Sequence, residues 1–377
     1  MLDSVEGRRR TRLLAEKVSS DLDAVVCTSP ENVYFFTGFR TMLYTRFVAA
    51  LIRMDSPEEP ILIVSTVDRR LIEDRVWSPP WVTRVSFHGP EQSATVASSP
   101  ALALQPHLHG AARIGVDSIR LSDLGELERA APGARIEQIA GVIGDLKGIK
   151  KEREIEYIRQ ANGLAMKGLE LAADILQGGP TTELEIAVRL EAEARRDGAD
   201  GFGYPTLVSA GAKMVAVHSP ALRRKVELGQ PVRVAFGPTV EGYTGDVVRT
   251  YCVGQPPAEL LRLEGAFLAA RDALLGLIRP GVTVPNMLAA VRAIYEDRGV
   301  AGYWWNNIGH GLGLTVHEPP AIGGTSEAVL LPGMVVALEP NLLVPGIGGF
   351  AHCDVVVVTE TGYDLLTDGM NGLVRVG

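Results

Sequence analysis

Two histidines stand among glycines in the segment Asn307-Ile-Gly-His310-Gly-Leu-Gly-Leu-Thr-Val-His317-Glu-Pro-Pro320. Glycine lets a backbone turn tightly and approach a ligand closely. An isolated histidine is more often a core or surface residue than a ligand. The glycines beside His310, however, leave room around its ring for a metal ion or a substrate. We therefore predict a site role for His310.

Two further segments carry carboxylates that are candidates for the same site. Asp246 lies in Gly242-Tyr-Thr-Gly-Asp-Val-Val-Arg249-Thr250, and Glu339 lies between Leu338 and Pro340. A carboxylate on the inward face of a strand needs a metal ion, a cation or a hydrogen-bond donor, because its burial without a partner is costly. In the alternative interpretation, Asp246 only pairs with Arg249.

The first part of the chain alternates short apolar runs with polar runs that suit helices. Helices are expected near the N-terminus and at about residues 118–131, and the stretch from Gly89 to Pro106 is expected to be a loop plus a weak helix. Alternation of this kind predicts an α/β layer domain. The apolar runs that we assign to strands are 24–27, 47–52, 61–64, 82–87 and 114–116.

The remainder of the chain contains a repeated pair of predicted helices. Apolar residues at helical spacing indicate a long helix after Lys151, ending at Gly178, and a capping sequence at Thr182 starts a second one. The pattern recurs about a hundred residues later, with a helix over 260–278 and another that opens at Thr283. The repeat indicates two related halves about a pseudo-twofold axis, although two ordinary helical hairpins could also match by accident. Strands are expected after each pair, at 231–236, 247–253, 334–338 and 354–359, with a hairpin turn in 242–245.

Composition and charge narrow the classes of function. A chain of 377 residues is long enough for two domains, each with its own core. A net charge of -8 without a concentrated basic patch argues against a nucleic-acid or membrane-surface role. No apolar run approaches the ~20 residues that span a bilayer, and the first residues lack the apolar core of a signal peptide. Three distant cysteines fit a reducing cytoplasm, so we expect a soluble cytoplasmic protein.

The order of the Asp246, His310 and Glu339 segments, followed by Ala351-His352-Cys353-Asp354, resembles that of the pita-bread family of Xaa-Pro dipeptidases, methionine aminopeptidases and creatinase. The resemblance implies an α/β (α+β) protein. A creatinase-like N-terminal α/β domain would span residues 1–147, and a pita-bread catalytic domain with an internal pseudo-twofold would span residues 148–377. It also implies that His317 stabilises charge beside the substrate; a histidine that only bonds backbone at a strand end is the alternative.

Two of the five metal-ligand positions of the family differ in this chain. Ala235 stands where the family's first aspartate belongs, and Cys353 stands where its last glutamate belongs. We therefore do not expect a two-metal centre. One divalent metal ion (zinc, manganese or iron) could be held by a mixed set of side chains, and loss of the metal is equally compatible with the same residues. The members of that set are Asp246, His310, Glu339 and Cys353.

Creatinase, the metal-free member of the family, suggests further site residues. Its catalytic histidine corresponds by resemblance to His218, and an imidazole that titrates near neutral pH can pass a proton between water and a departing nitrogen. The alternative role for His218 is orientation of the substrate. Arg46 falls where creatinase has an arginine that reaches a substrate carboxylate across a dimer interface, and Phe39 belongs to the neighbouring aromatic segment. The glutamates that help the catalytic histidine in creatinase do not carry over, because Val248 occupies one such place and His352 the other. His352 is a further candidate for substrate binding.

These residues lead to one preferred function and two alternatives. We expect a hydrolase that cleaves a C–N bond in a small molecule, by a metal-independent or single-metal route in which His218, His310, His317 and Glu339 are catalytic. Candidate substrates are an amidino or cyclic-amidine compound, an N-acyl amino acid and an unusual dipeptide. The alternatives are a metal-dependent Xaa-Pro dipeptidase or aminopeptidase and a catalytically silent binding module. We expect a homodimer in which the N-terminal domain covers the partner's active-site cleft.

Overall fold

The computed structural model describes residues 3–41, 46–77, 79–89 and 97–377. By its internal contacts the chain divides into two compact units, Met1–Leu146 (unit 1) and Lys147–Gly377 (unit 2). Part of the loop expected after Gly89, residues 90–96, lies outside the described residues. Each unit is described by itself below.

Unit 1 is built on a six-stranded mixed sheet with the strand order β4-β3-β2-β1-β5-β6. The central strand β1 (Ala24–Cys27) is buried along its whole length, pairing parallel with β5 (Arg113–Val116) and antiparallel with β2 (Ala49–Arg53). This confirms the predicted α/β layer. The other elements are α1 (Ser4–Lys17), α2 (Pro30–Thr37), β3 (Ile61–Ser65), α3 (Arg69–Glu73), β4 (Arg84–His88), α4 (Pro100–Leu108), α5 (Leu121–Ala130), β6 (Arg135–Gln138) and α6 (Ala140–Gly148).

The four long helices of unit 2 form the predicted repeat. The first pair is α7 (Glu152–Gln177) and α8 (Glu183–Arg196), and the second is α9 (Ala258–Leu277) and α10 (Val284–Asp297). Thr182 caps α8 by accepting from the backbone N–H of Glu185 at 3.2 Å, and Thr283 caps α10 in the same way. The second helix of each pair therefore begins where the sequence placed its cap.

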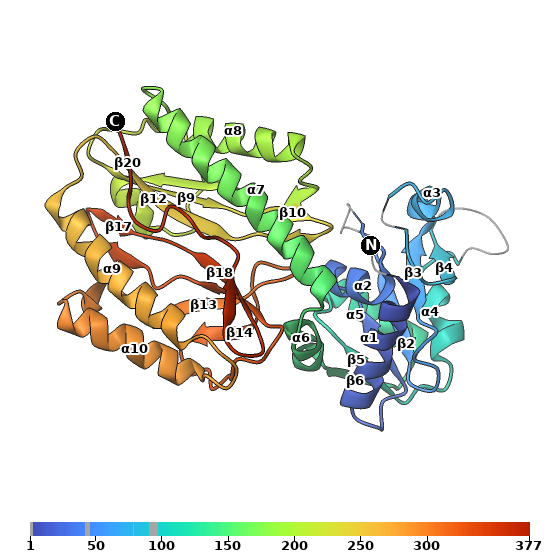
Figure 1. Ribbon diagram of the computed structural model, residues 1–377. Coiled ribbons are helices and arrows are strands. Elements are labelled where there is room, and N and C mark those ends of the chain that lie inside the picture. Colours follow the sequence, from blue (N-terminus) through green and yellow to red (C-terminus); the bar gives the residue numbers. More distant parts are fainter. Residues whose placement is uncertain (1–2, 42–45, 78, 90–96) are drawn as a thin grey trace. The chain divides into compact units, whose positions relative to one another are not determined.

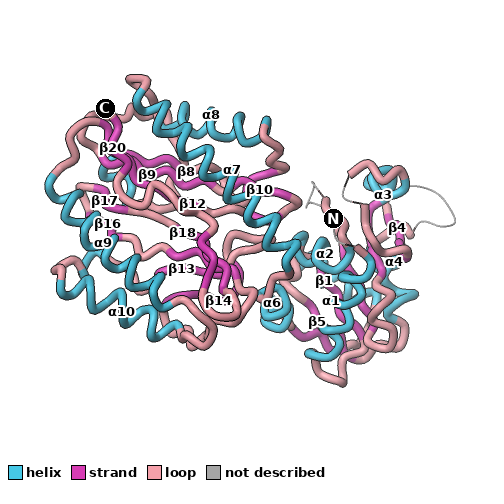
Figure 2. The backbone as a smooth tube through the Cα atoms, viewed as in Figure 1, coloured by secondary structure: helices cyan, strands magenta, loops and turns pink. Residues whose placement is uncertain are grey.

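Between the helix pairs lie the strands of unit 2 (Figures 1 and 2). One hydrophobic core joins α7 and α8 to a four-stranded sheet of order β20-β12-β9-β8, and another joins α9 and α10 to a five-stranded sheet of order β14-β13-β15-β18-β19. The chain thus has the pita-bread architecture of two related halves. The strands are β7 (Gly201–Phe202), β8 (Leu207–Ala210), β9 (Pro231–Phe236), β10 (Pro238–Val240), β11 (Tyr243–Thr244), β12 (Val247–Val253), β13 (Asn307–Gly311), β14 (Glu318–Gly323), β15 (Val335–Leu338), β16 (Leu342–Val344), β17 (Gly348–Phe350), β18 (Asp354–Val358), β19 (Tyr363–Leu365) and β20 (Val374–Val376).

One turn lies earlier than the sequence suggested. We expected the hairpin turn inside 242–245, but Tyr243–Thr244 is strand β11, which pairs with β10. The turn consists of Glu241 and Gly242, whose φ angles are 48° and 78°. Two successive residues at positive φ match the twist of a two-residue hairpin, so the connection closes before Tyr243.

The sheet register brings the two altered ligand positions together. Val248 on β12 pairs with Ala235 on β9, and on its other side it forms an isolated bridge to Cys353. The backbone N–H of Cys353 donates to the carbonyl of Val248 at 3.1 Å. Ala235 and Cys353 are therefore both neighbours of one valine, although 118 positions separate them in the sequence.

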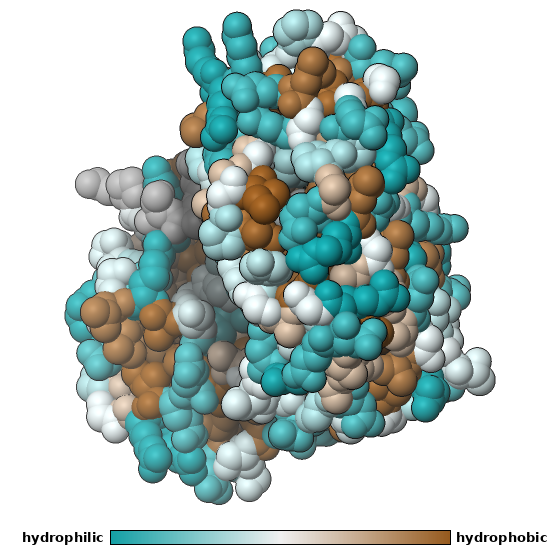
Figure 3. Space-filling model, turned by 90° about the vertical axis from the view of Figure 1, so that its left-hand side faces the viewer, coloured by the Kyte–Doolittle hydropathy of each residue, from teal (hydrophilic) through white to brown (hydrophobic). Residues whose placement is uncertain are grey.

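On the face drawn in Figure 3, hydrophilic side chains are interspersed with separate, smaller hydrophobic areas. Among the described helices, none combines the length and the apolar character that crossing a membrane requires.

Candidate active site

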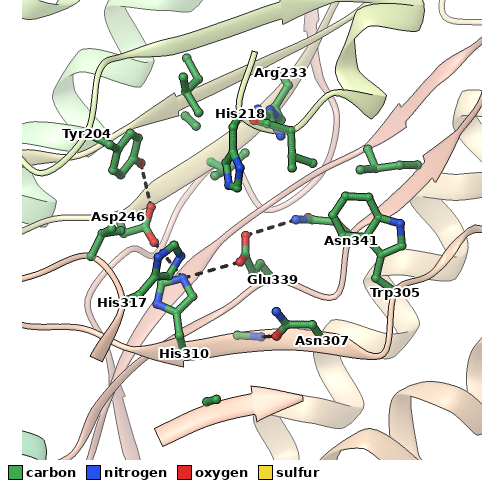
Figure 4. A pocket seen from close by; sticks show the side chains of 18 of the residues that line it. Tyr204, His218, Arg233, Asp246, Trp305, Asn307, His310, His317, Glu339 and Asn341 are labelled. Atoms are coloured by element: carbon green, nitrogen blue, oxygen red, sulfur yellow. Dashed lines mark hydrogen bonds and ion pairs between the residues drawn. The ribbon is translucent and has the colours of Figure 1, made fainter. Parts of the chain in front are cut away.

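A cavity of about 810 Å³ lies within unit 2 and collects most of the candidate residues (Figure 4). His218, His310, His317, Asp246 and Glu339 all line it, so the two sheets bring together residues that the sequence separates by up to 121 positions. The other lining residues are Tyr204, Pro205, Leu207, Val217, Pro220, Arg233, Ala235, Val248, Tyr303, Trp305, Asn307, Gly309, Val316, Glu318, Pro319, Ala321, Asn341 and Leu343.

The orientation of His310 is fixed by its own backbone neighbour. Its Nδ1 lies 3.1 Å from the carbonyl oxygen of Gly311. A carbonyl can only accept, so Nδ1 carries a hydrogen and donates it. The other ring nitrogen, Nε2, faces two carboxylates, at 3.5 Å from Asp246 and 3.6 Å from Glu339. The prediction that His310 and Asp246 lie together is confirmed.

Asp246 and Glu339 are both buried, and burial disfavours the charged form of each carboxyl group. Burial raises the pKa of Asp246, and burial together with the charge of Asp246 raises the pKa of Glu339. Tyr204 donates from its hydroxyl to Asp246 at 2.7 Å, and Asn341 donates its amide to Glu339 at 3.3 Å. Two carboxylates that flank one imidazole favour a shared proton or a cation between them.

The glycines around His310 serve the packing of β13. A Cβ atom on Gly309 would lie 2.1 Å from the carbonyl oxygen of Ala337, and one on Gly311 would lie 2.2 Å from that of Pro319. These positions therefore exclude any side chain because the neighbouring strands approach so closely. Room for a ligand beside His310 comes instead from the cavity itself.

Glu318 holds the loop that carries His317. Its Oε1 accepts from the backbone N–H groups of Leu314 at 3.0 Å and Thr315 at 3.3 Å, and its Oε2 accepts from Lys150 Nζ at 3.0 Å. Burial raises the pKa of Glu318, but Lys150 and Lys147 outweigh that effect and keep it below its ordinary value. The carboxylate is therefore charged and tied to three donors.

His317 projects from this loop against His310. The two rings meet edge to face, with centroids 4.3 Å apart. Burial and the neighbouring His310 lower the pKa of His317, so the imidazole is neutral over more of the pH range than an exposed histidine. A neutral imidazole can donate or accept a proton at its free nitrogen.

Arg233 and His218 occupy the opposite wall of the cavity from β13 (Figure 4). Arg233 belongs to β9, and its Nη2 donates to the carbonyl of Val217, the residue before His218. His218 lies in the turn after a short 3-10 helix (Gly211–Val215) and is exposed to the cavity. His218 thus lines the cavity from a different element than His310 and His317 do.

Comparison with known proteins decides the family. The model of metallopeptidase family M24 matches residues 156–360, more than half of the chain. The chain belongs to metallopeptidase family M24. The creatinase/prolidase N-terminal domain model matches residues 9–147 of the same chain. The resemblance inferred from the sequence motifs is confirmed.

Relatives and solved structures agree with this membership. The M24 chain is 29% identical over 347 residues to an uncharacterised peptidase of Staphylococcus epidermidis, covering 92% of this chain and 95% of the relative. It is similar to the prolidase of Pyrococcus horikoshii, with 25% identity, a TM-score of 0.85, and coverage of 96% and 98%. It is also similar to the dipeptidase PepE of Mycobacterium ulcerans, with 25% identity, a TM-score of 0.85, and coverage of 100% and 99%. The M24 chain is therefore a hydrolase of the Xaa-Pro peptidase type, which argues against a catalytically silent module.

M24 is a family of metallopeptidases, which typically use side chains of the active site to bind divalent metal ions. The methyl group of Ala235 lines the cavity but cannot bind a metal ion, and Cys353 is fully buried and is not part of the lining. Within the described part of the chain, no three histidine, cysteine, aspartate or glutamate side chains gather in a way that could hold a metal ion. The donor set does not match the family's two-metal centre.

His352 and Asp354 of this M24 member lie behind the cavity. His352 is 1% exposed, and its Nε2 bonds to Asp354 at 3.0 Å, which leaves it outside the cavity lining. Arg249 and Arg271 also bind Asp354, at 3.3 Å and 2.5 Å. Arg249 therefore pairs with Asp354 and not with Asp246, so the simple Asp246–Arg249 pair considered from the sequence is wrong.

Two predicted site residues belong to unit 1. Arg46 is exposed and acts electrostatically on Asp68 and His88. Phe39 is 1% exposed and follows α2, after Gly38 ends that helix in the left-handed conformation. Neither residue is among those that line the cavity of unit 2.

Several polar residues of the site were not predicted from the sequence. Tyr204, Arg233, Glu318 and Asn341 line the cavity, but none was singled out as functional. Glu318 had a usable signal, because it directly follows His317 in the most informative motif. Arg233 also had one: a lone arginine inside an apolar strand, two residues before Ala235. Tyr204 and Asn341 carry no comparable signal.

Proposed function

We propose that this M24 hydrolase cleaves a C–N bond in a small molecule without the family's two-metal centre. The observation that carries the proposal is one cavity in which three histidines meet the carboxylates of Asp246 and Glu339, while Ala235 and Cys353 occupy two ligand positions of the family. We also propose residues 148–377 as the catalytic domain and residues 1–147 as a separate N-terminal domain, because every residue that lines the cavity belongs to the former.

In the proposed reaction, His218 is the general acid and base. Its imidazole accepts a proton from the attacking water and delivers a proton to the departing nitrogen, because one ring nitrogen can accept and the other can donate. The exposure of His218 to the cavity supports this assignment over that of a histidine held only for structure. No metal ion is needed for these two proton transfers.

The remaining groups stabilise charge as it develops. Burial and the neighbouring His310 lower the pKa of His317, and its neutral imidazole can donate a hydrogen bond to an oxygen or nitrogen that becomes negative. His310 is held by Gly311 and faces Asp246 and Glu339, so its position is set before substrate arrives. Groups whose positions are fixed in advance reduce the reorganisation that the reaction requires.

A second candidate function is a metal-dependent Xaa-Pro dipeptidase. It is favoured by the approach of Asp246 and Glu339 to His310 Nε2 at 3.5 Å and 3.6 Å, and by the similarity to a prolidase and a dipeptidase. As placed, these side chains do not form a metal site, so this function requires them to rearrange around a single divalent ion, which would supply Lewis-acid chemistry at the scissile bond. Cys353 is buried close to this set, because burial and then the charges of Asp246 and Glu339 raise the pKa of its thiol.

Turnover assays with metal analysis separate the two functions. The purified protein is incubated with an Xaa-Pro dipeptide, an N-acyl amino acid and an amidino compound, each with manganese, zinc or cobalt and each with a chelator. We expect C–N cleavage that a chelator does not abolish and no more than one metal ion per chain. Efficient dipeptide cleavage that requires two metal ions per chain would refute the proposal, and cleavage that requires one would establish the second candidate. Replacement of His218 by Gln should abolish the chelator-resistant reaction while leaving the fold intact.

A further inference from the structure

Arg233 places a positive charge on the wall of the cavity that carries Ala235. The two residues are two positions apart on β9, and both line the cavity. Side chains two positions apart on a strand point to the same face of the sheet. The guanidinium is nevertheless removed from bulk solvent, because Arg233 as a whole is only 4% exposed.

The protein satisfies this guanidinium only in part. Its Nη2 donates to the carbonyl of Val217, whereas its Nε is buried and has no hydrogen-bond partner. None of the described acidic side chains forms an ion pair with Arg233, although Glu339 acts on it through space. A buried charge ordinarily has an opposite charge beside it, because desolvation is otherwise uncompensated. The cavity therefore presents a cation that lacks its anion.

The residue at position 235 also leaves the positive charge of Arg233 without a partner. Where the family has an aspartate that faces the cavity, this chain has Ala235, which removes a negative charge from the strand that presents Arg233. An aspartate two positions from the guanidinium on the same face would have been a ready partner for it. With alanine there, the positive charge of this wall remains available to a ligand.

We propose that Arg233 binds the carboxylate of a small-molecule substrate. A guanidinium is planar, keeps its charge when buried, and presents parallel N–H donors that match the two oxygens of a carboxylate. The histidines proposed for catalysis, His218, His310 and His317, line the same cavity as Arg233. A small molecule that binds Arg233 through its carboxylate would therefore carry the bond that is cleaved. This inference names the substrate class for the hydrolysis proposed above and rests on that reaction for its role in turnover. Its test measures binding alone.

The binding test compares two probes that differ in charge. Phenylacetate and 2-phenylethanol have similar size, and neither contains a C–N bond. Their affinities are measured by ligand-observed NMR titration for the wild-type protein, Arg233→Gln and Arg233→Lys. Arg196→Gln is the matched control, because Arg196 is an exposed arginine on α8 that pairs with Glu193 at 3.0 Å and does not line the cavity. Melting curves of each variant confirm that it is folded.

The wild-type protein should bind phenylacetate about 10- to 100-fold more tightly than 2-phenylethanol, the range expected for charge-assisted hydrogen bonds. Arg233→Gln should abolish this preference, Arg233→Lys should keep part of it, and Arg196→Gln should leave it unchanged. Equal affinities in the wild-type protein, a preference that persists in Arg233→Gln, or no saturable binding of phenylacetate would overturn the proposal. Inorganic phosphate that binds where phenylacetate does not would overturn the assignment to carboxylates. If Arg233→Gln does not fold, the wild-type and Arg233→Lys measurements still decide.

This binding test is independent of catalysis. If C–N hydrolysis is found but the charge preference is absent, the proposed function stands and the role of Arg233 is wrong. If the preference is found but no C–N hydrolysis occurs, the anion site stands and the reaction proposed for the cavity is wrong.

Discussion

Replacement of Glu318 by Gln should destabilise unit 2 and loosen the loop that carries His317. Glu318 and Lys150 form a buried ion pair in which each side chain is 2% exposed. Glutamine keeps the size of the side chain and an oxygen that can accept from the backbone N–H groups of Leu314 and Thr315. It removes the negative charge, however, and the ammonium of Lys150 loses the carboxylate that binds it at 3.0 Å.

The unpaired ammonium of Lys150 accounts for most of the expected loss in the free energy of unfolding. Removal of one partner from a buried ion pair typically costs about 3–5 kcal/mol, because the remaining charge has no compensation. Weakening of the two backbone hydrogen bonds, from charge-assisted to neutral, adds roughly 1 kcal/mol. Together these two losses lead us to expect that the free energy of unfolding of unit 2 falls by about 4–6 kcal/mol at neutral pH.

Urea denaturation, with amide hydrogen exchange of residues 312–318, measures both effects. The double variant Glu318→Gln/Lys150→Met removes both charges and should recover most of the lost stability. Glu193→Gln is the control, because Glu193 pairs with Arg196 on the surface of α8. The loss of such an exposed pair should cost no more than about 1 kcal/mol. The reasoning is refuted if Glu318→Gln is as stable as the wild-type protein, or if the double variant is no more stable than the single one.

The same substitution should have a pH-dependent effect. The folded-state pKa of Glu318 is below its ordinary value of 4.5, because Lys150 and Lys147 outweigh burial. The carboxylate therefore stabilises the fold fully above about pH 4.5, and this contribution is lost as the pH falls through the lower folded-state value. The stability difference between the wild-type protein and Glu318→Gln should be constant from pH 6 to 8 and shrink in acid. A difference that grows on acidification would contradict this assignment.

Two further predictions concern the cavity and the assembly. Tyr204→Phe removes the hydroxyl that donates to Asp246 at 2.7 Å, so turnover should fall about 10- to 100-fold. The hydrogen bond lowers the pKa of Asp246 by favouring its charged form. Its loss should therefore move the acid limb of the pH–rate profile to higher pH. An unchanged profile would show that Asp246 does not titrate in the reaction. We also propose a homodimer in which Arg46 of one protomer binds substrate in its partner, so light scattering should show a dimer, and Arg46→Ala should raise KM while leaving the melting temperature unchanged. A fully active monomer would contradict it.

The elements of the fold were predictable from the sequence because their signals are local. Thr182 and Thr283 cap α8 and α10 as expected, since a capping hydroxyl acts on a backbone N–H only three residues away. The four-residue run at Ala24 is a strand buried along its whole length. Helix α2, in contrast, was not assigned, because its aromatic residues show no clear helical spacing and only Gly38, at φ 76°, marks its end.

The convergence of Asp246, His310 and Glu339 also followed from the sequence, through motifs whose order matches the family. What these motifs could not show is how each site residue is supported. Lys150 and Glu318 form their buried pair although 168 positions separate them. Periodicity reports which face of an element is buried, but it does not identify the residue on another element that meets that face.

The sequence by itself thus determined the family, the two helix pairs and the absence of two ligands, because each depends on residue type and short-range spacing. Only the tertiary structure decided which side chains serve the cavity. Sheet register puts Arg233 on the cavity wall beside Ala235 and places Val248 between Ala235 and Cys353. It turns His352 away to Asp354. Adjacent residues on a strand face opposite sides of a sheet, so register and packing decide which of them meet a substrate.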